Sequence, residues 1–367
     1  MVDNNINKKE TTIFIDGVFD IMHSGHFNAI RQAKKLGNKL FIGVCEEQSV
    51  IRAKGPPLMN DEERFYLVQA CKWADKVIDK IPYTPTIEIL DSIGADFAAH
   101  GDDEALDEHG NDVYKDFKLA NRMKIFKRTD GVSTTDMIGR LLMIGINYKI
   151  ENLKLSNNIN DNIYNEKINY NPLTSKFLCT GRRFREFCNS KLPTSSDKVI
   201  YIDGMFDILH VGIIEALEKA KSYGSFLYVG IYDDETCKKV YGDSFPVLSL
   251  NERTINLLAL KFVDDVVIAC PLIVNEHVVS GLNISNVVLD ESCDFKVKDN
   301  NVEIDRYSYP KQQDMVKKIK CKYSLDNNLL IDRIMHQKEK YVVKYLKKAE
   351  KEKNYYKTRD LTNIYEI

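Results

Sequence analysis

The sequence predicts two tandem α/β domains, each a Rossmann-like doubly wound parallel sheet. The first observation is an internal repeat, because residues 12–34 (TIFIDGVFDIMHSGHFNAIRQAK) recur as residues 199–221 (VIYIDGMFDILHVGIIEALEKAK). The second is the alternation of short β-branched apolar runs with helical patterns, which is typical of a parallel sheet covered by helices on both faces. The third is the length of 367 residues, which suits two domains of middling size.

The repeat extends beyond this first block, which identifies it as a domain duplication. Residues 59–64 (MNDEER) correspond to residues 248–253 (LSLNER), and 73–79 (WADKVID) correspond to 262–268 (FVDDVVI). An Asn-rich stretch with little periodicity, typical of a linker, lies between the copies. We predict a first domain over residues 1–150, a linker and lead-in over 151–197, a degenerate second domain over 198–335 and a charged C-terminal helix or tail over 336–367.

Within the first copy, the hydrophobic pattern predicts each element in turn. Strands are expected over residues 12–15, 40–45, 76–81, 96–100 and 124–128, and helices over about 25–36, 61–73 and 86–92. The carboxyl ends of parallel strands meet at one edge of the sheet, where such folds bind ligands. We therefore expect a site at that edge, built from the residues that end the strands: Asp16, Cys45, His100 and Arg128.

Composition narrows the class of protein. The formal net charge of −2 argues against a nucleic-acid partner, which usually requires a basic excess. The sequence has no apolar run near the roughly 20 residues that cross a bilayer and no secretory signal pattern. Eight cysteines without a CxxC pair favour reduced, buried thiols. We expect a soluble, cytoplasmic protein.

The HSGH segment of the first copy follows the first strand and opens the first helix. Gly25 allows a ligand to approach the backbone, and a helix N-terminus offers free N–H groups with partial positive charge. His23 and His26, three positions apart, lie on one side of that helix start. This pattern favours binding of a polyphosphate, although HxxH alone is equally compatible with a metal pair or with surface histidines.

Four segments together resemble the cytidylyltransferase family: DGVFDIMHSGH, KGPPLMNDEER, PYTPT and RTDGVSTT, the last over residues 128–135. The spacing and tandem architecture are most similar to its ethanolamine-phosphate branch. The resemblance implies transfer of CMP from CTP to phosphoethanolamine, giving CDP-ethanolamine and pyrophosphate for phosphatidylethanolamine biosynthesis, with Mg²⁺ as cofactor. Phosphocholine as the acceptor and a nucleotide-binding scaffold without catalysis are the alternatives.

Transfer to CTP requires no covalent enzyme intermediate, because the acceptor phosphate is the nucleophile, so positioning and charge stabilisation suffice. His23, His26, Lys54 and Arg128 are the candidate catalytic residues. Lys54 as a solvated loop lysine, a Ser/Thr helix cap after Arg128 and Arg64 in a surface ion pair are the structural alternatives. The candidate nucleotide-binding residues are Gly17, Val18, Phe19, Asp20, Gly25, Arg64, Thr129, Gly131, Val132, Ser133 and Thr134.

The acceptor carries an ammonium group, which a carboxylate beside an aromatic face suits. By resemblance, Asp16 and Tyr114 lie nearest this group, and Tyr83 and His100 are weaker candidates that are equally compatible with half-buried polar residues. The sequence does not identify metal ligands, and the acidic residues 102–104 read as a solvated loop rather than a metal site.

The second copy lacks most of these groups. Its motif is His210-Val211-Gly212-Ile213, Tyr241 replaces Lys54, and CKYSLDNN at residues 321–328 replaces RTDGVSTT. Removing one such donor costs about 10²–10³ in rate, so we predict that the second copy folds but is catalytically inert.

The C-terminal segment places apolar residues at helical spacing with lysines opposite, namely Ile334, Tyr341, Val342, Tyr345 and Ala349. We expect this helix to dock on the second domain, whereas weak peripheral membrane contact is the alternative. The sequence leaves the oligomeric state open between two domains packed within one chain and a homodimer.

Overall fold

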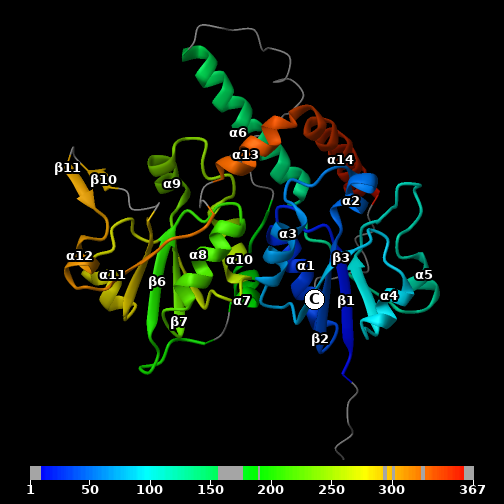
Figure 1. The fold of residues 1–367 in the computed structure, drawn as a ribbon, viewed down its shortest axis with the longest axis horizontal. Helices are drawn as coiled ribbons and strands as arrows, with labels where there is room; N and C mark the ends of the chain where they lie inside the picture. The colour runs from blue at the N-terminus through cyan, green and yellow to red at the C-terminus, as the bar shows by residue number, and fades with distance from the viewer. Residues whose placement is uncertain are drawn as a thin grey trace, which may run out of the picture. The chain divides into compact units, whose positions relative to one another are not determined.

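The computed structural model describes residues 10–155, 177–188, 191–291, 296–299, 302–323 and 327–358. Its contacts divide the described chain into two compact units. One contains residues 10–20, 25–129 and 353–358, and the other contains residues 21–24 and the described part of 130–352. Each unit is built around one five-stranded sheet (Figure 1).

The first sheet confirms the predicted doubly wound fold. Its strands are all parallel and run in the order β3-β2-β1-β4-β5. The chain therefore reverses its direction of winding at β1, and ligands of such sheets bind at the carboxyl ends beside this point. The strands are β1 (Thr12–Gly17), β2 (Lys39–Cys45), β3 (Lys76–Ile81), β4 (Phe97–Gly101) and β5 (Met123–Phe126).

The helices of this unit begin close to where the sequence places them. The helix predicted over residues 61–73 ends at Gln69, and the chain then forms turns up to β3. Two short helices were not predicted, because neither has a long apolar pattern. The helices are α1 (Ser24–Lys35), α2 (Glu47–Lys54), α3 (Asp61–Gln69), α4 (Ile87–Ser92) and α5 (Lys115–Leu119), of which α2 and α5 are the additional ones.

The second sheet repeats the first, with order β12-β9-β6-β7-β8 and parallel pairing throughout. The registers correspond: Ile13 pairs with Phe97 in the first sheet, and Ile200 pairs with Asn286 in the second. Its strands are β6 (Val199–Gly204), β7 (Phe226–Ile231), β8 (Asp265–Ile268), β9 (Asn286–Asp290) and β12 (Val316–Ile319). A hairpin of β10 (Lys296–Asp299) and β11 (Val302–Asp305) stands outside this sheet.

Helices cover the second sheet as in the first copy. Helix α8 packs on β6, β7 and β12, and α10 packs on β7 and β8. The helices are α7 (Gly181–Phe187), α8 (Val211–Lys221), α9 (Asp234–Tyr241), α10 (Leu250–Leu258), α11 (Glu276–Gly281) and α12 (Ser308–Gln312).

Three further helices are α6 (Thr134–Leu155), α13 (Asn328–His336) and α14 (Lys338–Thr358). Helix α6 continues five residues into the predicted linker, whose residues 156–172 lie outside the described ones. Glycines of α6 allow close approach, since a Cβ at Gly139 would lie 2.6 Å from the Tyr345 ring and one at Gly145 2.5 Å from Met335. The predicted apolar face of the C-terminal segment therefore packs against α6 within its own unit.

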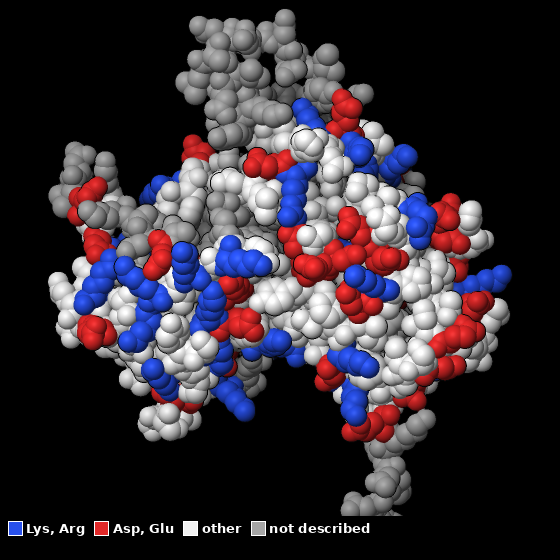
Figure 2. All heavy atoms as spheres, in the orientation of Figure 1, with Lys and Arg blue, Asp and Glu red and all other residues white. Residues whose placement is uncertain are grey.

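Two surface properties complete the description. On the face in Figure 2, acidic and basic side chains are interspersed over the described residues. Among the helices that the structure describes, none is long and apolar enough to span a membrane.

Candidate functional site

A carboxylate and a tyrosine meet at the winding reversal of the first sheet. Asp16 ends β1, and the Tyr114 hydroxyl donates a hydrogen bond of 2.9 Å to its Oδ1. The Tyr114 ring lies 4.8 Å from the ring of His100, which comes from the end of the neighbouring strand β4. These three predicted acceptor residues are therefore brought together by strand order, although 98 residues separate Asp16 from Tyr114 in the sequence.

The Tyr114 side chain is positioned by a small network that sequence reasoning missed. The Tyr114 N–H donates to Asp112 Oδ1 at 3.0 Å, and the Lys118 ammonium pairs with Asp112 Oδ2 at 2.6 Å. A signal was present in the repeat, because Asp112-Val-Tyr114 corresponds to Asp305-Arg-Tyr307 in the second copy. Asp112 is thus a positioning residue for the aromatic side of the site.

Lys54 joins the same group of residues. It ends α2 with its side chain exposed, and its Nζ lies 4.8 Å from the ring centroid of Tyr83, which follows β3. Its positive charge acts on both Asp16 and His100. We call these five residues the Asp16 cluster: Asp16, Lys54, Tyr83, His100 and Tyr114.

Burial sets the protonation states of the Asp16 cluster. Desolvation raises the pKa of Asp16 to about 7, although the Tyr114 hydrogen bond and the Lys54 charge oppose the rise. Burial lowers the pKa of His100, so its imidazole is neutral at pH 7, and burial raises the pKa of Tyr114 well above its usual value. Asp16 is therefore about half-ionised at pH 7. A bound cation would favour its ionised form.

The HSGH segment lies where the sequence predicts. Helix α1 begins at Ser24, so Gly25 and His26 lie in its first turn. None of the first-turn residues of α1, all of which the structure describes, is acidic, so no side chain there neutralises the positive end of the helix dipole. The preceding turn has left-handed backbone at Phe19 (φ 51°) and Ile21 (φ 49°), and the second copy repeats the first of these at Phe206 (φ 43°).

Two polar side chains of α1 hold the segment after β5, which carries Arg128. Gln32 Nε2 donates to the Lys127 carbonyl at 2.8 Å, and Asn28 Nδ2 donates to Thr129 Oγ1 at 2.9 Å. Arg128 lies between these two anchors, and its guanidinium is 3.7 Å from Asp103. Asn28 and Gln32, both fully buried, were not among the predicted residues, because helical spacing gives no sign of which segment a polar side chain faces.

The remaining part of the RTDGVSTT motif begins α6. Gly131 has a φ of +77°, a left-handed conformation that favours glycine. The Ser133 Oγ accepts a hydrogen bond of 3.2 Å from the Asp136 N–H. This contact is a Ser/Thr helix cap, the structural alternative for this motif.

Asp20 and Arg64, predicted to contact nucleotide, hold loops together in this structure. The Asp20 carboxylate accepts hydrogen bonds from the N–H groups of Leu58 and Met59 at 2.9 and 3.0 Å. Arg64 is fully buried, donates to the carbonyls of Val18 and Cys45 at 2.7 and 2.8 Å, and also pairs with Asp61 of its own helix, so the ion pair expected within this helix is present but buried on the arginine side.

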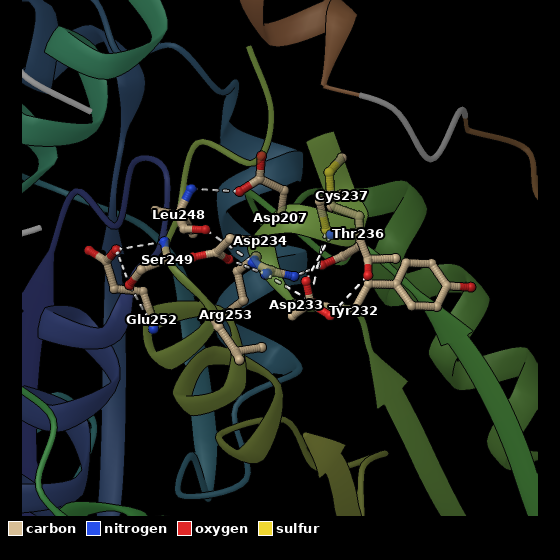
Figure 3. A network of polar contacts seen from close by, with 12 residues as sticks. Asp207, Tyr232, Asp233, Asp234, Thr236, Cys237, Leu248, Ser249, Glu252 and Arg253 are labelled. Carbon is tan, nitrogen blue, oxygen red and sulfur yellow. Dashed lines mark hydrogen bonds and ion pairs between the residues drawn. The ribbon is translucent and has the colours of Figure 1, made fainter. Parts of the chain in front are cut away.

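The second copy retains both of these loop contacts, as Figure 3 shows around Arg253. Asp207 accepts from the N–H groups of Val247 and Leu248, both at 2.8 Å. Arg253 donates to the carbonyls of Met205 and Tyr232 at 2.7 and 2.9 Å. A copy without the second motif histidine keeps these contacts, so they serve the fold irrespective of catalysis.

Several groups at the predicted phosphate and acceptor positions differ between the copies. His26 corresponds to Ile213, which is buried in α8, and Lys54 corresponds to Tyr241. The register of the two sheets places Leu289 at the position of His100. The first histidine remains as His210, whose Nδ1 accepts from the Gly212 N–H at 3.2 Å and caps α8.

The chain does not provide a dedicated metal cage within the part that the structure describes. No group of three or more His, Cys, Asp or Glu side chains there is arranged to hold a metal ion. Mg²⁺ is bound mainly by substrate phosphates and water in many phosphate-transfer sites. Such a site needs no preformed group of three protein ligands, so Mg²⁺ stays an expectation with no residue of the chain assigned to it.

Comparison with known proteins defines the class of this one. The model of the cytidylyltransferase-like family matches residues 14–140 and again residues 201–355. The chain therefore belongs to the cytidylyltransferase-like family of nucleotidyltransferases, with two copies of the family's domain.

Within this family the chain is similar to ethanolamine-phosphate cytidylyltransferases. It is 39% identical to that of Dictyostelium discoideum over 86% of this chain and 88% of the relative. It is 34% identical to that of Arabidopsis thaliana over 97% of this chain and 87% of the relative. Choline-phosphate cytidylyltransferase 2 of Arabidopsis thaliana is 36% identical, but over only 41% of this chain and 51% of the relative.

Proposed function

We propose that the first copy transfers CMP from CTP to phosphoethanolamine, giving CDP-ethanolamine and pyrophosphate. The observation that carries the proposal is the Asp16 cluster, in which a buried carboxylate with a pKa of about 7 lies beside aromatic rings at the sheet edge. The ammonium group of phosphoethanolamine is the positive partner that favours the ionised form of Asp16. The similarity to ethanolamine-phosphate cytidylyltransferases over most of both chains supports the same substrates.

The phosphates are bound at the start of α1. A phosphate oxygen of phosphoethanolamine attacks the α-phosphorus of CTP, and the bond to pyrophosphate breaks. His23 and His26 stabilise the charge that develops on the transferring phosphorus, while Lys54 and Arg128 bind the phosphates as cations. Lys54 lies 4.8 Å from Tyr83 in the Asp16 cluster, so it bridges the acceptor and the triphosphate. The chain's own residues bind and orient both substrates.

The second copy does not turn over substrate in this proposal. The comparison of the two copies supports it, since the positions of His26, Lys54 and His100 carry Ile213, Tyr241 and Leu289. The boundaries of the catalytic domain at residues 1–150 and of the degenerate domain at residues 198–335 stay predictions, since the contacts of the structure group residues 130–150 with the second unit. Mg²⁺ stays a proposal for the CTP complex, with no residue of the chain assigned to it.

Preference for the primary ammonium over the quaternary one is the direct test. We expect kcat/KM for phosphoethanolamine to exceed that for phosphocholine by about 10²-fold or more. A primary ammonium can donate N–H hydrogen bonds to Asp16, whereas a trimethylammonium leaves the carboxylate without such a donor. Steady-state rates on both acceptors measure the ratio. Asp16→Asn should reduce it, and an equal kcat/KM for both acceptors in the unmodified protein would favour the choline alternative.

The acceptor KM should depend on pH through Asp16. With a pKa of about 7, the ionised fraction of Asp16 rises from about one tenth at pH 6 to about nine tenths at pH 8. Because the ammonium binds the ionised form, the ionisation of Asp16 alone should lower the apparent KM for phosphoethanolamine about tenfold over this range. Burial lowers the pKa of His100 below its usual value and raises that of Tyr114, which stays protonated over this range.

The acceptor's own phosphate also titrates, with a pKa near about 6. Asp16→Asn measures that contribution alone, so its KM should change about twofold between pH 6 and pH 8. An identical tenfold change in the variant and the unmodified protein would remove Asp16 from the acceptor site.

A further inference from the structure

The second copy contains a counterpart of the Asp16–Tyr114 pair. Asp203 ends β6, and the Tyr307 hydroxyl donates to its Oδ1. The supporting contacts recur as well, because the Tyr307 N–H donates to Asp305 Oδ1 at 3.0 Å and Lys311 pairs with Asp305 Oδ2 at 2.9 Å. The carboxylate–tyrosine arrangement has therefore been retained in a copy that lost the motif groups for phosphate.

The residue between Asp305 and Tyr307 differs from its counterpart in the first copy. Val113 of the first copy corresponds to Arg306, which is 1% exposed. A guanidinium nitrogen of Arg306 lies 3.6 Å from Asp203 Oδ1, and another donates to the Tyr232 hydroxyl at 2.7 Å. The Arg306 guanidinium also donates a hydrogen bond to the Tyr307 hydroxyl.

The surroundings of this guanidinium are those of a cation site. Its central carbon lies 4.6 Å from the ring centroid of Tyr307 and 5.5 Å from that of Tyr232, distances at which aromatic faces attract a cation. A buried carboxylate provides the compensating charge, as buried cations require. The position of Lys54, the cationic side chain of the Asp16 cluster, carries Tyr241 in the second copy. No lysine at that position therefore repels the Arg306 guanidinium.

We propose that Arg306 fills, from within the chain, the cation site of the second copy that corresponds to the acceptor-ammonium site of the first. The second copy is thus closed to an ammonium-bearing acceptor by its own side chain, in addition to lacking phosphate-binding groups. The guanidinium also marks Asp16 and Tyr114 as the cation-binding pair of the first copy, and this part rests on the proposed function.

The first experiment opens the second site. Arg306→Val gives the second copy the residue of the first, and its full-chain unfolding midpoint should fall by roughly 5–15 °C because Asp203 loses its cation. Methylguanidinium at millimolar concentration, which matches the end of the removed side chain, should restore part of this loss saturably. Sodium chloride at equal ionic strength should not restore it. In a chain that carries Asp16→Asn and keeps Arg306, methylguanidinium should not raise the midpoint.

Background binding at the first cluster is removed by repeating the comparison with Asp16→Asn present in both proteins. Arg306→Lys, which keeps a cation, should need no rescue. A folded Arg306→Val chain whose midpoint does not respond to methylguanidinium would overturn the proposal. This arm does not depend on catalysis, so it stands or fails separately from the proposed function.

The second experiment closes the first site. Val113→Arg should raise the KM for phosphoethanolamine at least tenfold while the Kd for CTP stays within about twofold, a result that also reports on folding. Val113→Leu, of similar apolar character, is the matched control and should keep a KM near that of the unmodified protein. A Val113→Arg enzyme that binds CTP and has an unchanged acceptor KM would contradict the correspondence of the two sites, even where the first variant fails to fold.

Discussion

His26→Ala is expected to lower kcat for CDP-ethanolamine formation by about 10²–10³-fold, because it removes one donor from the charge that develops on the transferring phosphorus. His26 lies in the first turn of α1, with its ring 5.8 Å from that of Phe19. The side chain is partly exposed, so its removal should leave the fold intact. Steady-state kinetics with saturating CTP and phosphoethanolamine measures the change.

The second copy provides the matched control, His210→Ala. This change removes the cap of α8, which costs about 1 kcal/mol of stability, but it should leave kcat within about twofold. An equal loss of rate in the two variants would mean that the second copy takes part in catalysis. Full activity in His26→Ala would mean that catalysis takes place at another site. It would then favour a nucleotide-binding scaffold without catalysis as the role of this segment.

Arg140→Met is expected to destabilise its unit by about 3–5 kcal/mol, because it leaves a buried carboxylate without its partner. Arg140 of α6 makes two hydrogen bonds to Glu252, of 2.9 and 3.0 Å, and a third to the Val247 carbonyl at 3.2 Å. The two side chains are 4% and 1% exposed, so solvent does not screen the pair. Denaturant unfolding followed by circular dichroism gives the change in free energy.

Two further variants separate burial from ion pairing as such. Arg182→Met breaks an exposed pair with Glu186 and should cost less than about 1 kcal/mol. Combining Arg140→Met with Glu252→Leu should recover part of the loss, although Glu252 also accepts from the Ser249 N–H in the capping box of α10. A loss of less than about 1 kcal/mol in Arg140→Met alone would show that this pair does not stabilise the unit.

The internal repeat made much of this protein predictable. Alternating apolar runs and helical patterns predicted the parallel strands of both sheets, because the hydrophobic period is a local property of the chain. The HSGH segment fell at the start of α1 for the same reason. The repeat also acted as an internal comparison, in which Ile213 at the position of His26 predicts the inert copy without any structure.

Other features needed the folded chain. The sequence alone predicted a nucleotide-binding role for Asp20 and Arg64, and it did not reveal that both also join the turn after β1 to segments that follow much later in the chain. Asn28 and Gln32 were overlooked, since each reaches the segment after β5 only through the packing of α1. Such long-range contacts leave no periodic signal in the sequence.

The sequence by itself determined the fold class, the duplication and the family, and it supplied the candidate residues for the chemistry. Tertiary structure decided which of those residues share one environment, namely Asp16, Lys54, Tyr83, His100 and Tyr114, and what charge that environment permits. It also revealed Arg306 on the counterpart carboxylate of the second copy. The physical reason is that a residue's type is local, whereas its desolvation and its partners depend on how distant segments pack.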